Sequence, residues 1–486
     1  MVNFPLVYKI IGSLLFLLGT MLGICVAISL YYGEDDMMPF LISTLLTVSA
    51  GFIFKYVGRN ADNNLSRRDS YFLVTATWVI FTFFGMQPYL IGGYIPDVTD
   101  AFFETMSGFT TTGATILDNV EWLPHGILYW RTQTQWIGGL GIVFFTIAIL
   151  PSMVGSGSVK VFAAEATGPM RAKMHPRLST MAKWIWTIYL GLTVACVLSF
   201  YLCGMGWFDS INYAMTTTAT GGFSTHNDAT GYFNSPSIEY VSIAYQFLAG
   251  INFTMLYFAI FKLKVGTLLK SSEFKLYLFL IVLATSVIMY LLMTRNGYGM
   301  ERAFRSSLFH VVSFMTTTGI FNDDAAMWPH ITWVIMGSLM FVGACSGSTT
   351  GGFKCIRLVM VFKVLRNEFR RILHPNAVLP VKINGVPVSG QKLSTLLAFF
   401  AIFTFMLIIS GTIMIVAGID TINATVIALS CISNVGATLS TEVGPVMSWG
   451  ELPEYIKWTC SFLMLVGRLE IMSVLVLFTR AFWKEN

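Results

Sequence analysis

Long apolar runs separated by short polar loops extend along the whole 486-residue chain. A helix needs about 20 apolar residues to cross a bilayer, and ten of the runs are candidates for such spans. They lie at about 8–31, 38–57, 71–92, 126–150, 184–203, 238–261, 276–294, from 330 onward, 394–417 and 455–480. The pattern predicts an all-α polytopic membrane protein with about 10 transmembrane helices, the first of them a retained span rather than a removed signal peptide.

Four shorter apolar stretches stand between pairs of these runs. They cover about 98–110, 209–219, 303–316 and 421–433, and each ends in a small polar turn with glycine. None is long enough to cross a bilayer, so each is expected to enter the membrane and leave on the same side. Span, half-helix and span recur about every 100 residues, which indicates internal duplication. We expect an N-terminal hairpin at 1–69 and four pore repeats around one pore, at 70–159, 160–269, 270–375 and 376–486.

Charge predicts the orientation of the spans. Only 11% of the residues are charged, against about 25% in a typical soluble domain. When the loops are assigned alternately to two sides, one side carries the basic clusters within 160–183, 262–275 and 354–392. The other side carries most acids and only Arg131, Arg295, Arg302, Arg305 and Lys457 as basic residues. Because basic loops stay cytoplasmic, both termini are expected inside, and the half-helices enter from outside.

The four turns have the composition of an ion-conducting filter. They read Thr111-Thr112-Gly113, Thr220-Gly221-Gly222, Thr317-Thr318-Gly319 and Asn434-Val435-Gly436. A cation that sheds its water needs replacement oxygens, and backbone carbonyls supply them without a fixed charge. Glycine tolerates the dihedral angles required, threonine adds a hydroxyl, and the C-terminal end of a half-helix is partly negative. The alternative is that these turns are ordinary helix caps with glycine.

With these motifs the chain resembles, over its whole length, a TrkH-type subunit of the Trk/Ktr/HKT superfamily of potassium transporters. The resemblance implies one filter glycine per repeat, here Gly113, Gly222, Gly319 and Gly436. The fourth strand departs most from the pattern, with Asn434-Val435 in place of two threonines. The predicted filter residues are Thr110, Thr111, Thr112, Gly113, Thr220, Gly221, Gly222, Thr317, Thr318, Gly319, Asn434, Val435 and Gly436.

A second site is predicted in the last part of the third repeat. Val342 to Lys354 contains glycines and hydroxyl residues where the other repeats are expected to have ordinary helix, so the helix should break there. The phosphate-loop signature fails, because Phe353 rather than lysine follows Gly352. Arg468 stands inside the last apolar run, where a charge marks an ion pathway; the alternative is pairing with Glu470. The resemblance implies a gate formed by Gly343, Cys345, Ser346, Gly347, Ser348, Thr349, Thr350, Gly351, Gly352 and Arg468.

The sequence favours a channel-like potassium pore in the bacterial cytoplasmic membrane. The alternative is a symporter that couples potassium to protons or sodium, which needs buried acids such as Glu470 or Glu104. An enzyme is not expected, because no nucleophile–base pair or metal cluster stands out. No cofactor is expected in this chain. The resemblance implies a homodimer, potassium (with rubidium or sodium as possible further ions) as the permeant ion, and a cytoplasmic TrkA-type nucleotide-binding regulatory subunit.

Overall fold

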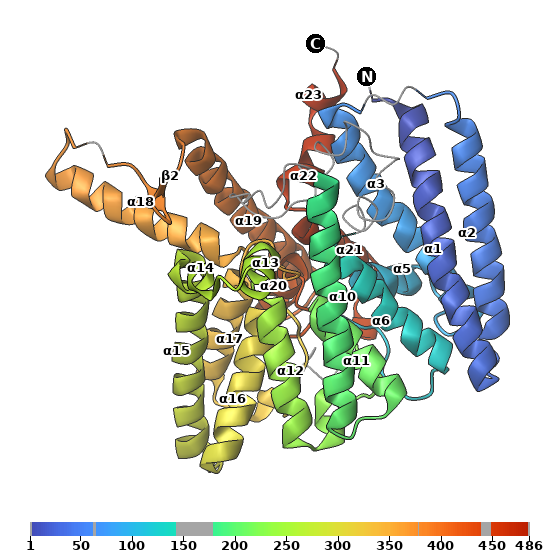
Figure 1. Cartoon of the computed structure of the whole chain (residues 1–486), viewed down its shortest axis with the longest axis horizontal. Helices are drawn as coiled ribbons and strands as arrows, with labels where there is room; N and C mark the ends of the chain where they lie inside the picture. The colour runs from blue at the N-terminus through green and yellow to red at the C-terminus, as the bar shows by residue number, and fades with distance from the viewer. Residues whose placement is uncertain (1, 62–64, 142–177, 378, 439–448, 485–486) are drawn as a thin grey trace.

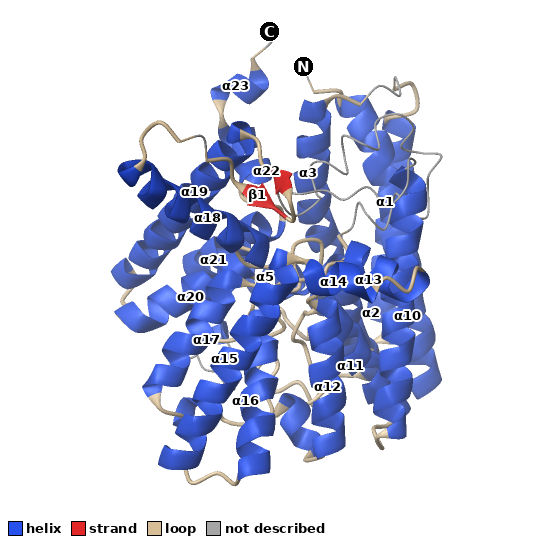
Figure 2. Cartoon of the chain, turned by 60° about the vertical axis from the view of Figure 1, so that its left-hand side comes forward, coloured by secondary structure: helices blue, strands red, loops and turns tan. Residues whose placement is uncertain are grey.

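The computed structural model describes residues 2–61, 65–141, 178–377, 379–438 and 449–484, and nearly all of the described elements are helices (Figures 1 and 2). The described strands are β1 (Lys382–Ile383) and β2 (Val386–Pro387), which form a two-stranded antiparallel ribbon. Six described helical segments are long and apolar enough to cross a membrane. They are α1 (Phe4–Tyr32), α2 (Met37–Val57), α3 with α4 (Arg67–Gly85 and Gln87–Ile91), α10 (Leu178–Leu202), α15 (Ser272–Arg295) and α19 (Gly390–Val416).

The first two helices form the predicted hairpin. The side chain of Asn3 accepts a hydrogen bond from Leu6 N at 3.2 Å and so caps the start of α1. Gly33, with a φ of 69°, ends that helix in the left-handed conformation that glycine tolerates best. The hairpin packs along α6 (His125–Gly139) and α3, so it lies beside the first repeat (Figure 1).

Four short helices occupy the places of the predicted half-helices. They are α5 (Val98–Phe109), α11 (Trp207–Ala219), α16 (Met300–Met315) and α20 (Thr421–Ser433). The helices that follow them, which we call the returning helices, are α6, α12 (Pro236–Ala249), α17 (His330–Val342) and α21 (Glu454–Arg468). Each short helix packs against the returning helix of its own unit. Short helices are therefore present where the sequence predicted half-helices.

The returning helices of units two and four are bent, which the sequence did not predict. Helix α12 meets α13 (Phe253–Phe261) at 104°, and α21 meets α22 (Met472–Leu475) and η5 (Val476–Phe478) at 108°. In unit three, residues 343–354 separate α17 from α18 (Cys355–Leu373). The expectation of ordinary helix outside unit three was therefore wrong. Asn252 explains one bend, because its side chain accepts from Thr254 N and Met255 N and starts a new helix.

The expected ten spans are only partly represented among the described residues. Counting each bent pair as one span gives up to eight crossing segments in this part of the chain. Helix α17 has only 13 residues, and most of the predicted run at 126–150 after Gly139, the end of α6, lies outside the described residues. The remaining described helices are short: α14 (Val265–Lys270), α23 (Arg480–Trp483), η2 (Ala229–Phe233), η3 (Ala325–Met327) and η4 (Trp449–Glu451).

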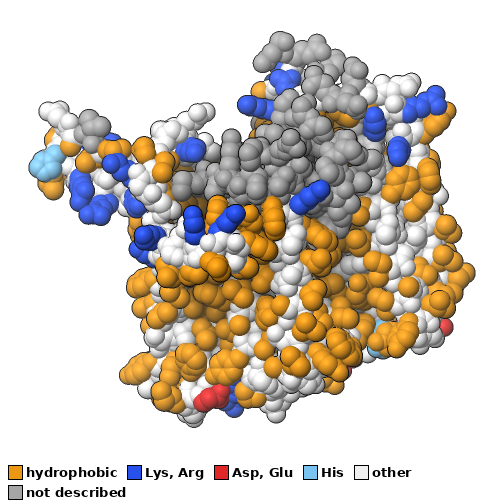
Figure 3. Space-filling view, viewed as in Figure 1, with side chains coloured by type: hydrophobic (Ala, Val, Ile, Leu, Met, Phe, Trp, Pro, Cys, Tyr) orange, Lys and Arg blue, Asp and Glu red, His pale blue; other side chains and the backbone are white. Residues whose placement is uncertain are grey.

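Apolar and charged side chains are distributed over the surface as in a membrane protein. Helices α2 and α19 expose apolar side chains such as Phe52 and Phe405, both about two-thirds exposed at 63%. Figure 3 shows a broad hydrophobic band, with lysine and arginine gathered above it toward the end of the molecule where the two termini lie. Apolar side chains on this scale face lipid rather than water.

Candidate functional site: a ring of four strands above an intramembrane loop

The four turns after the short helices have one backbone conformation. Their first residues all have positive φ: 53° at Thr111, 55° at Thr220, 55° at Thr317 and 55° at Asn434. The glycine two positions later also has positive φ: 82° at Gly113, 93° at Gly222, 71° at Gly319 and 74° at Gly436. Positive φ is uncommon outside glycine, so its recurrence at equivalent places shows that the turns are four copies of one structure. Asn434, which distinguishes the fourth turn in sequence, adopts the same conformation as the threonines.

The same hydrogen bond holds each turn to its short helix, and the four turns are called strands one to four from here on. The amide of the middle residue donates to a carbonyl five positions earlier. The four bonds are Thr112 N to Ser107 O at 2.9 Å, Gly221 N to Thr216 O at 2.9 Å, Thr318 N to Ser313 O at 2.8 Å and Val435 N to Ser430 O at 2.9 Å. Each strand is therefore anchored at the C-terminal end of a half-helix, where the helix dipole is negative.

The four strands close into a ring. A Cβ atom added at each glycine would collide with the middle carbonyl oxygen of the next strand. The distances are 2.2 Å from Gly113 to Gly221 O, 2.4 Å from Gly222 to Thr318 O, 2.1 Å from Gly319 to Val435 O and 2.1 Å from Gly436 to Thr112 O. The series runs from strand one to strand four and returns to strand one. All four glycines also line one pocket, together with Asp118 and His226.

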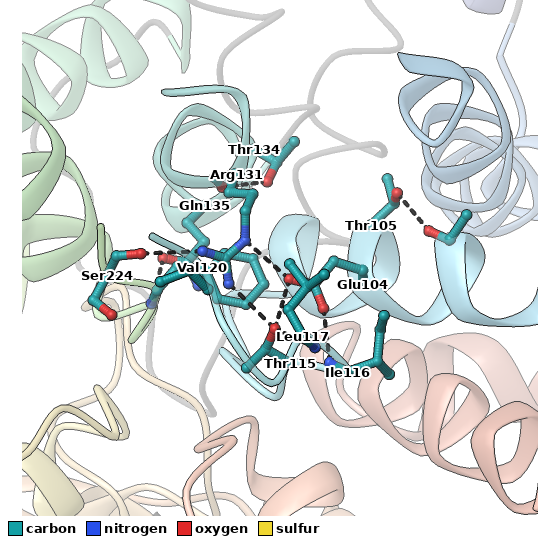
Figure 4. Close-up of polar contacts among 12 residues, drawn as sticks. Glu104, Thr105, Thr115, Ile116, Leu117, Val120, Arg131, Thr134, Gln135 and Ser224 are labelled. Carbon is teal, nitrogen blue, oxygen red and sulfur yellow. Dashed lines mark hydrogen bonds and ion pairs between the residues drawn. The ribbon is translucent and has the colours of Figure 1, made fainter. Parts of the chain in front are cut away.

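A buried ion pair supports the first strand (Figure 4). Glu104 on α5 accepts from Arg131 Nε at 3.0 Å, from Thr115 Oγ1 at 2.9 Å and from Ile116 N at 3.0 Å. Arg131 on α6 also donates to Ser224 O at 3.0 Å, just beyond the second strand. Assigning Arg131 to an outer loop was therefore wrong, since Arg131 lies on a helix and its side chain is only 2% exposed. The sequence did contain a signal for this pair, because Glu104 stands within a half-helix and Arg131 stands within the apolar run that follows it.

The predicted loop lies against the ends of three units. Thr349 Oγ1 donates to Thr218 O at 3.2 Å, at the end of α11. Gly351 N donates to Thr317 Oγ1 at 2.8 Å, on the third strand. A Cβ atom added at Gly351 would stand 2.1 Å from Ser433 O at the end of α20, so no side chain fits there. The loop therefore contacts residues of units two, three and four at the ends of their short helices and at the third strand.

Arg468 connects this loop to the first repeat. Its guanidinium donates to Thr349 O at 2.7 Å, to Gly138 O at 2.5 Å and to Gly139 O at 2.6 Å. The sequence therefore identified two partners that the structure brings together, the loop and Arg468. Glu470 forms an ion pair with Arg357 on α18, and the Arg357 guanidinium lies 3.9 Å from the centre of the Phe399 ring.

Sequence reasoning missed the other contacts that hold the loop. Cys345 N donates to Gly250 O at 3.1 Å, and Phe253 N donates to Gly347 O at 3.0 Å, so the loop is tied to the α12–α13 bend. The Asn252 side-chain amide donates to Ser346 O. Glu273 accepts from Ser346 N at 2.5 Å, and Lys354 donates to Thr350 O and Thr350 Oγ1. Lys354, two residues after the last glycine of the run, was the one local signal available.

Known proteins show the same architecture. The sequence model of the TrkH family, described as a cation transport protein, matches residues 37–485. The potassium uptake protein TrkH of Halomonas elongata is 35% identical over 99% of each chain, and that of Escherichia coli K12 is 33% identical over 99% of this chain and all of its own. The crystal structure of the potassium transporter TrkH from Vibrio parahaemolyticus superimposes with a TM-score of 0.89 at 32% identity, covering 99% of this chain and all of that one. The chain therefore belongs to the TrkH family, a family of membrane transporters rather than enzymes.

Proposed function

We propose that this protein takes up potassium across the bacterial cytoplasmic membrane through a channel-like pore that passes through the ring of four strands. The observation that carries the proposal is the ring itself, in which each strand's glycine meets the carbonyl oxygen of the next strand. Related proteins are named potassium uptake protein and potassium transporter, which supports potassium as the ion. Potassium is the transported substrate, and no cofactor is expected in this transporter family.

In this proposal the filter binds potassium through backbone carbonyls of the four strands. Strands of this kind replace the water that the ion loses on entry. The first residue and the glycine of each strand both have positive φ, so the four strands share the backbone conformation that the proposal requires. Four half-helices end at the ring, and their partly negative C-terminal ends favour a cation there. The site consists of the strand residues 110–113, 220–222, 317–319 and 434–436.

The loop at 343–352, together with Arg468, acts in this proposal as the gate. Thr349, Gly351 and the ends of α11 and α20 are in direct contact, which leaves little room for an ion below the ring. Arg468 adds a positive charge beside the loop, and a partly buried positive charge repels a cation. Releasing Arg468 from its three carbonyl partners would remove the hydrogen bonds through which it holds the loop to the end of α6.

The division into a hairpin and four pore repeats belongs to the same proposal. The recurring order of helices and the four equivalent strands support boundaries near 69, 269 and 375, whereas the boundary at 159 lies outside the described residues. The basic surface at the end that holds both termini supports cytoplasmic termini (Figure 3). A homodimer and a TrkA-type regulatory subunit rest on the family resemblance alone.

The acids that a symporter would use have other partners. Glu104 pairs with Arg131, and Glu470 pairs with Arg357. Both therefore have structural roles, which favours a pore without a proton relay.

Ion-competition flux in liposomes tests the function. We expect purified protein to carry potassium and rubidium down their gradients, and sodium more slowly. We also expect the reversal potential to follow the potassium gradient when the pH or sodium gradient is changed. A reversal potential that shifts with the second ion would show coupled symport, and equal potassium and sodium flux would contradict the filter.

A further inference from the structure

The four strands are held at their outer ends in different ways. In units three and four, a serine on the half-helix donates to a carbonyl seven residues later: Ser313 to Ile320 O at 2.6 Å and Ser430 to Ala437 O at 2.8 Å. Each of these units therefore fastens its own strand. The equivalent residue of unit two is Thr216, and its hydroxyl donates to Gln135 Oε1 at 2.7 Å instead.

Gln135 takes the place of that direct bond. It stands on α6, in unit one, and is fully buried. Its Oε1 atom accepts from Phe223 N at 3.1 Å, at the outer end of strand two. Its Nε2 atom donates to Gly221 O at 2.7 Å, the middle carbonyl of the same strand. One side chain from unit one thus connects the half-helix and the strand of unit two.

Gly221 explains why this side chain is needed. The middle residues of strands one and three are threonines whose hydroxyls bond to neighbouring threonines, Thr112 to Thr110 and Thr318 to Thr316, both at 2.8 Å. Gly221 has no side chain for such a bond. A Cβ atom added there would stand 2.4 Å from both Cδ and Oε1 of Gln135. The amide of Gln135 therefore fills the space where strands one and three have a side chain of their own.

We propose that Gln135 is a specificity-determining positioning residue of the filter, which keeps the carbonyls of strand two in register with those of the other three. Strand two contains two consecutive glycines and therefore has the most conformational freedom of the four. Without Gln135 its carbonyls could adapt to ions of different size, so discrimination should fall while permeation continues. This inference rests on the proposed potassium pore.

The test compares potassium-to-sodium permeability ratios from bi-ionic reversal potentials of the full chain in liposomes. We expect Gln135→Ala to lower the ratio about tenfold, the effect of one or two hydrogen bonds. Gln133→Ala is the matched control, because Gln133 lies on the same helix, is buried, and contacts Cys25 and Met21 rather than the filter. It should change stability without changing the ratio. An unchanged ratio in a folded, conducting Gln135→Ala protein would overturn the inference.

A second variant keeps the test decisive if Gln135→Ala fails to fold. Gly221→Ala leaves Gln135 in the chain but displaces its amide, so it should lower the ratio by a similar factor. Where both single variants fold, their double variant should lose no more than either one, because both remove the same contact. Multiplied losses would show independent effects and would refute the proposal. A wild-type protein without potassium selectivity would instead refute the proposed function.

Discussion

Replacing Arg468 tests the gate most directly. Its guanidinium donates to three carbonyl oxygens, Thr349 O, Gly138 O and Gly139 O, at 2.5–2.7 Å. A hydrogen bond with a charged partner contributes about 1.5–3 kcal/mol. Bonds from one side chain are not additive, so we take about 3 kcal/mol as the loss from the closed arrangement in Arg468→Ala. That loss changes the ratio of closed to open molecules on the order of 100-fold.

Rubidium uptake into proteoliposomes measures this change, because a leaking gate raises uptake without any regulatory partner. We expect Arg468→Ala to raise the initial rate by one to two orders of magnitude, limited by how often the wild-type pore opens. Arg371→Ala is a suitable control, since Arg371 is an exposed arginine that pairs with Glu368 on α18. It should leave the rate unchanged.

Arg468→Lys separates two explanations of the leak. Lysine keeps the positive charge but cannot reach three carbonyls with the planar fork of a guanidinium. If the hydrogen bonds hold the gate, the lysine variant should leak nearly as much as the alanine variant. If repulsion of the ion dominates, the lysine variant should behave like wild type. Wild-type rates in both variants would refute the gate.

Three further predictions concern the filter, the loop and the outer face. Gly113→Ser should abolish potassium-over-sodium discrimination in liposome flux, because the added Cβ would stand 2.2 Å from Gly221 O and the site has a φ of 82°; unchanged selectivity would contradict the four-strand filter. Shortening 346–350 should raise rubidium leak to a degree similar to Arg468→Ala, and a tight pore would count against the loop as gate. Burial raises the pKa of Asp209, but contacts with His226 and Thr225 outweigh it and leave the pKa below its ordinary value. The ionised Asp209 carboxylate should therefore stabilise the fold fully above about pH 4, and this contribution should be lost at lower pH. The melting temperatures of wild type and Asp209→Asn should then converge in acid. A difference that stays constant with pH would contradict this prediction.

Local patterns made much of this site predictable. The half-helices can be recognised in the sequence because they are too short to span a membrane. The strands can be recognised because glycine, in three strands preceded by threonine, recurs after each half-helix. Arg468 was visible because a charge is rare inside an apolar run. The sequence did not show that Asn434 is equivalent to the threonines that begin the other strands. Asparagine adopts positive φ more readily than most residues, and the backbone shows that Asn434 has the same conformation as those threonines.

Pairings between residues far apart in the sequence were hard to predict, because no local pattern specifies which side chains meet. Glu104 could have served as a proton relay or as a structural partner, and only the packing of α5 against α6 decides that it meets Arg131. The bend after α12 was also hard to predict, because it depends on contacts with residues far away in the sequence. It follows a single glycine, Gly250, and depends on Asn252 capping the next helix while its amide contacts Ser346 in another unit.

Helix α6 contacts both the strands and Arg468. Its residues Arg131 and Gln135 hold strands one and two, while its last carbonyls, at Gly138 and Gly139, accept the hydrogen bonds of Arg468. A Cβ atom at Gly138 would stand 1.7 Å from Phe109 O, so α6 also packs tightly against the end of the first half-helix. Gln135 precedes Gly139 by about one helical turn. In the proposed pore, a displacement of this helix end on release of Arg468 would therefore be transmitted to Gln135 and strand two, so the proposed gate and the proposed filter would be coupled.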